Sequence, residues 1–454
     1  MGQKKRLLGD LDGVQFARSL NRRGFIGLSG ALGAGALLAT SLSAQAVPKI
    51  KSKAKIVIAG AGAAGLAAAS RLSDRLDGAE IILVDGRKAH FYQPGFTLVA
   101  GGIKSADYPV STTAEYVPRS ATWIEEYVSE FDPESNSITT ASGQKISYDY
   151  LLVTTGLMLN YAGIEGMDEQ LIGKDGLGSI YHSPQAAAAT WQLLDRFADS
   201  GGDGVFLRPA TEMKCAGAPL KYTFITDDHL RRRDNRSKAK LTYNAHSGNL
   251  FSVPIVHEKL RMLFENRGIE THYNRVLSAI DPGKRIATFT SVEEGSVELP
   301  YDFINVVPPM RAPEAIRNSP LPWQDGKWAS DGWLEVSKDN LRHARYQNVF
   351  AIGDIAGVPK GKTAASVKWQ TPVVVDHLVA EIAGKESEMV YNGYTSCPLI
   401  TRLGRAMLIE FDYRNNLVPS FPGVIAPLEE LWATWVIKTV ALKPTYISML
   451  RGSA

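Results

Sequence analysis

The sequence predicts an α/β protein of two or three domains, the first of them Rossmann-like, with an amphipathic C-terminal region. Three observations lead to this prediction. A β-branched run at 55–59 passes directly into a glycine-rich turn and an Ala- and Leu-rich helical stretch. A second apolar run, 204–209, predicts another buried strand in the middle of the chain. Finally, the length of 454 residues exceeds one ordinary core and suits two or three domains.

Composition excludes several classes of protein. Hydrophobic residues make up 44% of the chain, which is enough to fill buried cores and excludes global disorder. Two cysteines cannot build a disulfide-rich scaffold or a four-thiolate metal site. The formal charge of +3 is carried by the first 46 residues, so the body of the protein is near neutral. It therefore lacks the basic surface of a nucleic-acid binder.

The N-terminus has the order of an export signal. Arg22 and Arg23 precede an uncharged, glycine-rich stretch at 24–42, and Ala44-Gln45-Ala46 offers a small-x-small cleavage site. This pattern resembles a twin-arginine signal, a route known for carrying folded proteins. We therefore expect a signal peptide at 1–46, a periplasmic location and a tightly bound cofactor. The alternative is an N-terminal membrane anchor, which the glycine content disfavours.

The glycine-rich turn has the features of a dinucleotide site. Gly60 permits the tight turn, Gly62 lets a pyrophosphate approach the backbone, and Gly65 lets helix and strand pack closely. The following helix presents its N-terminus to the pyrophosphate charge. The next strand, 81–84, ends in Asp85, which is placed to accept hydrogen bonds from a ribose. The alternative is an ordinary strand–turn–helix unit without a ligand.

A second pair of strands points to the kind of dinucleotide. The run 148–156 ends in Thr-Thr-Gly156, and the run 348–354 ends in Gly353-Asp354. This pairing resembles flavoproteins with two dinucleotide-binding domains, which have a glutathione-reductase-like fold and bind FAD at the first glycine motif. The resemblance implies that Asp354 contacts the ribityl chain or the pyrophosphate. Lys362 and Thr363 begin the next helix and are candidates for contact with the flavin pyrimidine ring. The alternative is that they only start the helix.

The middle of the chain departs from that pattern. After the strand at 204–209, no glycine triplet is present to hold a second nucleotide, and Cys215 stands in its place. The electron donor is therefore not expected to be NAD(P)H, which disfavours a type-two NADH dehydrogenase. No C-x4-C pair follows the first glycine motif, so the chain is not a standard disulfide reductase.

Cys215 and Cys397 are the only thiols. Lys214 and Lys221 are near Cys215 in the sequence, and nearby cations favour the nucleophilic thiolate. Cys397 is predicted to lie on a loop. We expect the two to form a redox pair at the flavin. A structural disulfide and two unrelated buried thiols are the alternatives. The histidines are scattered without ligand spacing, and no metal is expected.

Five further segments occur in order along the chain. They are His90-Phe91-Tyr92-Gln93-Pro94, 214–219, Val306-Val307-Pro308-Pro309-Met310, 362–365 and Tyr394-Thr395-Ser396-Cys397-Pro398. Together they make the chain similar to sulfide:quinone oxidoreductases of the two-cysteine branch, over roughly residues 54–415. The resemblance implies two Rossmann-like three-layer domains. It also implies that sulfide is oxidised to persulfide or polysulfide sulfur through Cys215 and Cys397, with electrons passing through FAD to quinone. Leu220 stands where the family commonly has Gln, and no cysteine occurs at 353–357.

The expected domain limits follow from these motifs. The FAD-binding domain takes 54–165 and 301–385, and the second Rossmann-like domain takes 166–300. The C-terminal region, 386–454, contains Cys397 and a helical pattern at 428–440 with two tryptophans, and a second apolar segment follows Pro444. Such segments suit shallow insertion into a membrane surface. Packing against the protein's own core or a dimer partner is the alternative, and a homo-oligomer is left open.

Two other functions compete with quinone reduction. The first is the flavoprotein subunit of a flavocytochrome c sulfide dehydrogenase, which is exported by the same route and passes electrons to a haem partner. The second is a flavin-binding interaction protein with no turnover, in which neither cysteine is needed.

Overall fold

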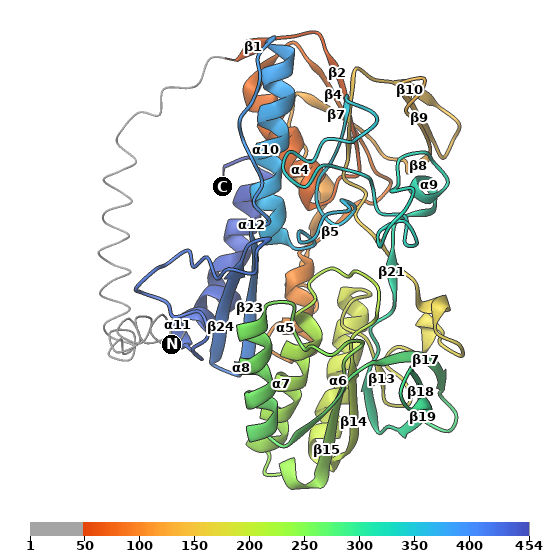
Figure 1. The fold of residues 1–454 in the computed structure, drawn as a ribbon, viewed down its shortest axis with the longest axis vertical. Helices are drawn as coiled ribbons and strands as arrows, with labels where there is room; N and C mark the ends of the chain where they lie inside the picture. The colour runs from red at the N-terminus through yellow and green to blue at the C-terminus, as the bar shows by residue number, and fades with distance from the viewer. Residues whose placement is uncertain (1–48, 454) are drawn as a thin grey trace.

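The computed structural model describes residues 49–453, so the predicted signal peptide lies outside the described residues. Two domains lie one above the other, and the C-terminal region runs along one side of both (Figure 1). Each domain has a five-stranded parallel sheet and its own hydrophobic core. The predicted α/β fold with two Rossmann-like domains is confirmed.

The first domain is built on a sheet of order β22-β11-β2-β4-β7. Its four inner and C-terminal strands are short apolar runs that are mostly buried, whereas the edge strand at 121–124 is only half-buried. The helices α4 (Ala63–Arg75) and α10 (Ala364–Ile382) pack together on the sheet. The strands are β2 (Lys55–Ala59), β4 (Glu80–Val84), β7 (Ala121–Ile124), β11 (Tyr150–Val153) and β22 (Val349–Ala351).

The second domain has a sheet of order β13-β20-β14-β15-β16. Its strands are β13 (Leu177–Gly178), β14 (Gly202–Leu207), β15 (Ala239–Asn244), β16 (Ile269–His272) and β20 (Phe303–Asn305). Its helices are α6 (Pro184–Ser200), α7 (Ala218–Arg232) and α8 (Pro254–Asn266). Because β20 pairs with β13 and β14, the predicted division between residues 300 and 301 falls inside this domain.

Smaller antiparallel units complete the two domains. The chain crosses between the domains through a two-stranded ladder, β12 (Met158–Leu159) with β21 (Met310–Arg311). The first domain also carries β5 (Ala89–Phe91), β6 (Val110–Thr112), α9 (Glu314–Arg317) and the sheet of β8 (Val128–Asp132), β9 (Ser137–Thr140) and β10 (Lys145–Ser147). The short helix α5 (Phe96–Ala100) follows β5 in the chain but packs on α6 and α7 of the second domain. The second carries β17 (Arg275–Asp281), β18 (Ile286–Ser291) and β19 (Gly295–Pro300).

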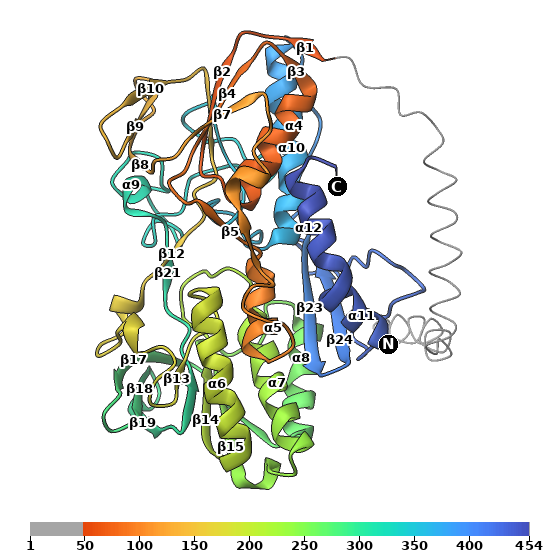
Figure 2. The ribbon, with the colours of Figure 1, turned by 180° about the vertical axis from the view of Figure 1, so that it is seen from behind.

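The C-terminal region is divided between the two cores. The hairpin of β23 (Thr395–Arg402) and β24 (Arg405–Phe411) packs on α7 of the second domain, and the two are side by side in both views (Figures 1 and 2). The last helix, α12 (Leu442–Leu450), packs on α4 of the first domain. Between them lie α11 (Trp432–Val436) and a π-helical segment, Ile437–Ala441.

The C-terminal helices differ from the predicted amphipathic pair. The helical structure begins at Trp432 rather than Leu428, and Pro444 lies inside α12 rather than before it. Tyr446, Met449 and Leu450 are buried in the core of the first domain, so this segment follows the alternative of packing on the protein itself. Within the described residues, we find no helix with the length and apolar character needed to cross a bilayer.

Candidate functional site

The glycine turn after β2 has the shape that a dinucleotide requires. Gly60 has φ +112°, a conformation that side chains rarely adopt. A Cβ on Gly65 would stand 1.9 Å from the carbonyl oxygen of Gly60, so this close approach is possible only for glycine. A Cβ on Gly62 would meet nothing nearer than 3.8 Å, which leaves open space at the N-terminus of α4. This opening suits a pyrophosphate at a helix N-terminus.

Asp85 fixes the turn from the end of β4. Its carboxylate accepts hydrogen bonds from the backbone N–H of Ala61 at 2.8 Å and of Arg87 at 2.9 Å. The side chain is buried at the predicted position beside the glycines. Two backbone donors do not exhaust the acceptor sites of a carboxylate, so a ribose hydroxyl can still be accommodated.

The second half of the nucleotide site comes from the loop after β22. Gly353 has φ +86°, and its N–H donates to Oε1 of Gln370 at 2.8 Å. Asp354 follows; burial raises the pKa of its carboxyl, and the ammonium groups of Lys214 and Lys362 oppose this. Gly156, after β11, has φ +71° and open space at its Cβ position. These open, glycine-lined surfaces fit the dinucleotide that the sequence predicts.

The side chains of Lys362 and Thr363 both make hydrogen bonds to nearby parts of the chain. The ammonium of Lys362 donates to the carbonyl oxygens of Asp354 and Ala356 and lies 3.6 Å from the centre of the Trp333 ring. Burial lowers the pKa of Lys362 to about 8. Thr363 is the N-cap of α10, accepting from the N–H of Ser366 at 3.1 Å. Their contact with a flavin stays a prediction.

Cys215 lies on the loop between β14 and α7 with φ +46°, a strained conformation for a side chain of this type. The backbone is held on three sides. Its N–H donates to the carbonyl oxygen of Lys362 at 2.9 Å, and its own carbonyl accepts from the Ala218 N–H at 2.8 Å and the Tyr181 hydroxyl at 3.0 Å. This loop is therefore anchored to both domains.

Cys397 faces the same loop from the C-terminal hairpin. It lies within β23, opposite Ile409 of β24, so its predicted position on a loop is wrong. The strand is explained by the pairing of apolar runs on either side of the turn at 403–404, which a single-strand pattern does not reveal. A Cβ on Gly217 would stand only 2.4 Å from Sγ of Cys397. The structure thus brings the two cysteine segments together, with both residues as free thiols.

The ammonium group of Lys221 interacts with the sulfur atoms of both cysteines. It is 2% exposed on the first turn of α7, and its ammonium donates to Sγ of Cys215 at 3.6 Å. Burial alone would lower the pKa of Lys221, but the charges of Cys215 and Cys397 outweigh burial and raise it. Lys214, expected beside Cys215 as well, instead donates to Oε1 of Gln93 at 2.6 Å on the nucleotide side.

Lys438 is a further residue of the site, and the sequence motifs do not point to it. In the structure it is 3% exposed, because the π-helical segment turns it inward. Its ammonium donates to the carbonyl oxygen of Pro94 at 2.9 Å. Burial and the neighbouring Lys221 lower the pKa of Lys438 to about 7, while the two cysteines act in the opposite direction. The available signal was that Lys438 is the only charged residue between 431 and 442.

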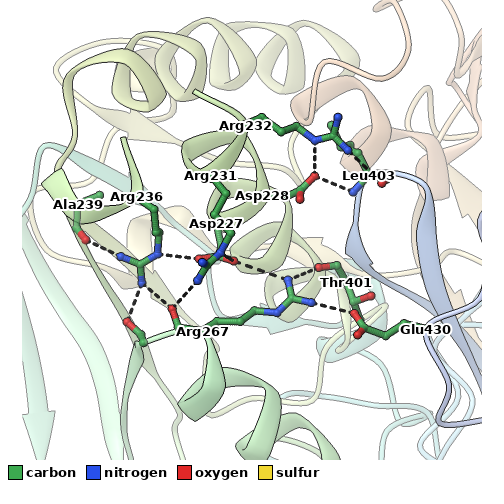
Figure 3. A network of polar contacts seen from close by, with 11 residues as sticks. Asp227, Asp228, Arg231, Arg232, Arg236, Ala239, Arg267, Thr401, Leu403 and Glu430 are labelled. Carbon is green, nitrogen blue, oxygen red and sulfur yellow. Dashed lines mark hydrogen bonds and ion pairs between the residues drawn. The ribbon is translucent and has the colours of Figure 1, made fainter. Parts of the chain in front are cut away.

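A network of ion pairs fixes the C-terminal region to α7 (Figure 3). Asp227 is fully buried and pairs with Arg231 and Arg236 at 2.8 and 2.7 Å. Arg267 also faces Asp227, at 3.6 Å, and donates to the carbonyl oxygen of Thr401 and to Glu430 at 2.8 Å. The same α7 begins near Cys215 and ends at this network, so the network positions β23, and with it Cys397, against α7.

The Pro308-Pro309-Met310 segment lies where the chain crosses between the two domains. The carbonyl oxygen of Pro309 accepts a hydrogen bond from the backbone N–H of Asn160, and the backbone N–H of Met310 donates one to the hydroxyl of Thr211, both at 2.8 Å. Within residues 49–453, no group of three or more His, Cys, Asp or Glu side chains is arranged to hold a metal ion.

Comparisons with known proteins agree with this geometry. A family described as pyridine nucleotide-disulphide oxidoreductase matches residues 54–191. The mitochondrial sulfide:quinone oxidoreductase of Dictyostelium discoideum is 36% identical over 375 residues, 82% of this chain and 81% of that protein. The mouse protein of the same name is 34% identical over 374 residues, with 82% and 81% covered. The solved sulfide:quinone oxidoreductase structure from Aquifex aeolicus has a TM-score of 0.73 at 21% identity, covering 88% of this chain and 92% of that one.

Proposed function

This chain belongs to the sulfide:quinone oxidoreductase family, and on that premise we propose that Cys215 and Cys397 are its redox pair. Its activity is the oxidation of sulfide with quinone as electron acceptor, and its cofactor is FAD. The flavocytochrome alternative is not favoured by these relatives. The observation that carries the proposal is the meeting of the Cys215 loop and Cys397 around the buried ammonium of Lys221.

The resting enzyme holds the two sulfurs oxidised, as a disulfide or with a bridging sulfur. Hydrosulfide attacks one sulfur and forms a new S–S bond, while the bond between the cysteines breaks. One cysteine becomes a persulfide and the other leaves as a thiolate. FAD, held by the glycine turn at 60–65 and the loop at Gly353 and Asp354, would supply the two-electron acceptor that links the reduced sulfur centre to quinone. The bound sulfur then passes to an acceptor or grows as polysulfide.

The two lysines have different tasks at the cysteine pair. Lys221 donates to Sγ of Cys215 at 3.6 Å, and its raised pKa keeps it an ammonium, so it stabilises thiolate charge through the cycle. Lys438 has a pKa of about 7, so its Nζ gains or loses a proton near neutral pH. This allows Lys438 to take up the proton that hydrosulfide releases and to give it away later.

The experiment is anaerobic absorbance of the purified flavoprotein. Sulfide should bleach the wild-type flavin, and a soluble quinone should restore it. Cys215→Ser and Cys397→Ser should each abolish bleaching while retaining FAD, because neither change touches the glycine turn at 60–65, Asp85 or the loop at Gly353 and Asp354. Bleaching at wild-type rate in either variant contradicts the proposed pair, and recovery only through cytochrome c contradicts quinone as the acceptor.

We further propose that the enzyme works in the periplasm, exported by the twin-arginine route and held at the membrane surface by its C-terminal region. The support for export is the Arg22-Arg23 pair before the uncharged stretch and the Ala-Gln-Ala site. The support for membrane contact is Phe421 and Val440, which are 46% and 62% exposed on the region that also carries Trp432 and Trp435.

Vesicle flotation tests the membrane contact. The variant with Phe421→Asp and Val440→Asp should lose binding to lipid vesicles, because both charges would have to enter the interface. Val292→Asp is the matched control, since Val292 is fully exposed in the second domain. Equal flotation of the double variant and the control would contradict the proposed surface.

A further inference from the structure

A surface crevice lies between α6 and the segment 99–106, on the side of the molecule that also carries α11 and α12 (Figure 2). Its volume of about 370 Å³ is at the lower end of the range for small-molecule sites. We call it the Trp191 crevice. One lysine, Lys104, is among its lining residues, and its apolar side chains are Val99, Ile103, Ala106, Ala188 and Trp191.

Trp191 forms a fixed wall of this crevice. A Cβ on Gly102 would stand 2.5 Å from a ring carbon of Trp191, so the indole packs directly against the backbone. The ring of His229 lies beside it, with the two ring centres 4.9 Å apart, and Nε2 of His229 donates to the carbonyl oxygen of Gly101 at 2.9 Å. A wall that is already held in place loses little conformational entropy when a ligand binds.

Two lysines lie against the ring of Tyr108 at the edge of the crevice. The ammonium of Lys104 is 5.0 Å from the ring centre, and the ammonium of Lys443, in α12, is 4.7 Å from it. Lys443 also donates to the carbonyl oxygen of Tyr108. Over residues 49–453, neither ammonium forms an ion pair, and the exposed carboxylate of Asp107 is paired with neither. Two like charges thus meet without a counter-charge, which favours an anion beside them.

The pair of lysines continues the surface that we propose to contact the membrane. Val440 is 62% exposed and precedes Lys443 by three residues, about one helical turn. Exposed apolar side chains next to lysine are typical of a helix at a membrane interface, where anionic lipids attract the cations. Because Lys443 contacts Tyr108, the crevice adjoins this face.

The chemistry of the ligand follows from the charges and the apolar walls. A neutral ligand would leave both ammonium groups without a counter-charge. A free inorganic anion would leave the apolar walls in contact with water. A phosphate that carries an acyl chain meets both requirements, because lysine binds phosphate oxygens and the chain covers the apolar side chains.

We propose that the Trp191 crevice binds one anionic phospholipid from the membrane surface. The lipid phosphate lies between Lys104 and Lys443, and the first part of an acyl chain lies against Trp191 and Ile103. The inference rests on the proposed membrane contact of the C-terminal region. It adds a lipid-selective site formed mainly by α6 and the segment 99–106, so anionic headgroups are preferred over zwitterionic ones.

The test measures binding of monomeric lipid to the FAD-loaded enzyme. Short-chain phosphatidylglycerol, kept below the concentration at which it forms micelles, should raise the Tm of wild type. Lys104→Gln and Lys443→Gln should each need an at least about tenfold higher concentration for the half-maximal rise, because each loses a charge-assisted contact. Lys174→Gln is the matched control, since Lys174 is an exposed lysine of the second domain.

A second pair of variants tests the crevice without changing charge. Ala188→Phe places a ring in the cavity and should weaken the response to the lipid as Lys104→Gln does. Ala141→Phe is its control, because Ala141 is exposed in the first domain, away from the crevice. Short-chain phosphatidylcholine, whose headgroup has no net charge, should give a much smaller rise in wild type.

Three results would overturn the proposal. They are an equal response to phosphatidylglycerol in wild type and Lys104→Gln, an unchanged response in Ala188→Phe, and an equal rise in wild type with inorganic phosphate alone, which would indicate a site for a free anion. The vesicle flotation described above is independent of this test. If the variant with Phe421→Asp and Val440→Asp floats like its control while the monomeric lipid still requires Lys104, the C-terminal membrane contact fails and the lipid site stands.

Discussion

A substitution at Gly217 would displace Cys397 without changing either cysteine. Its backbone has φ −85° and ψ −4°, which any residue adopts, so Gly217→Ala introduces no backbone strain. The added Cβ would stand 2.4 Å from Sγ of Cys397. The next neighbours, carbon atoms of Phe251 and Lys221, are at 3.7 and 3.8 Å, which is ordinary contact. The steric effect therefore falls on Cys397 alone.

The size of the effect follows from that distance. Ordinary contacts of a Cβ lie at 3.4–4 Å, so Sγ of Cys397 must retreat by about 1 Å. Misplacement of a reacting group by about 1 Å can cost on the order of 10²-fold in rate. Overpacking of a buried site costs roughly 1–3 kcal/mol of stability. We expect sulfide-dependent bleaching to slow by about two orders of magnitude, with a modest loss of stability.

Stopped-flow bleaching by sulfide is the assay, with thermal unfolding measured alongside it. Gly248→Ala is the matched control, because a Cβ on Gly248 meets nothing within 4 Å in the same domain. The control should behave as wild type in both measurements. If Gly217→Ala also bleaches at the wild-type rate and unfolds at the wild-type temperature, the close approach of the Cys215 loop to Cys397 is wrong.

Two further predictions concern groups that the C-terminal region brings to the site. The pKa of Lys438 is lowered to about 7 from an ordinary value near 10.5, so the unfolded chain binds more protons between these values and stability should rise with pH there. Lys438→Met should therefore raise the free energy of unfolding of the reduced enzyme, measured by urea denaturation, by roughly 3–5 kcal/mol at pH 6 and by much less at pH 10. An equal increase at both pH values would show that burial does not lower the pKa of Lys438. Glu430→Gln removes the 2.8 Å ion pair to Arg267 and should make 412–431 more susceptible to limited proteolysis, with about 1 kcal/mol lost. Glu429→Gln, which changes the adjacent carboxylate, is its control. Equal cleavage rates of the two variants would contradict the proposal that the ion-pair network positions β23 against α7.

Much of the fold was readable from local patterns. The strand at 55–59, the glycine turn and Asp85 lie where the sequence predicts, because a buried parallel strand and a tight phosphate turn each impose a strong local composition. The limits of the second domain were less accurate. The short strand β20 is apolar for only a few residues and joins the second sheet through pairing with β13 and β14, which no local pattern encodes.

The sequence also predicts part of the site. Cys215 is recognisable because it stands where a second nucleotide-binding glycine turn would be, and the structure brings its loop to Cys397. The strand around Cys397 and the inward turn of Lys438 depend on long-range packing, since β23 needs β24 and α7 as partners. Lys438 is the charged residue of an otherwise apolar segment, and the π-helical segment changes the helix period at that point.

Peptide mapping of the oxidised enzyme under non-reducing conditions tests whether Cys215 and Cys397 form the redox pair. We expect a cross-linked fragment that joins the Cys215 and Cys397 peptides, directly or through an added sulfur. One equivalent of sulfide should open this link and leave a persulfide on one of the two peptides. If both cysteines are free before sulfide is added and unmodified after turnover with quinone, they are not the redox pair.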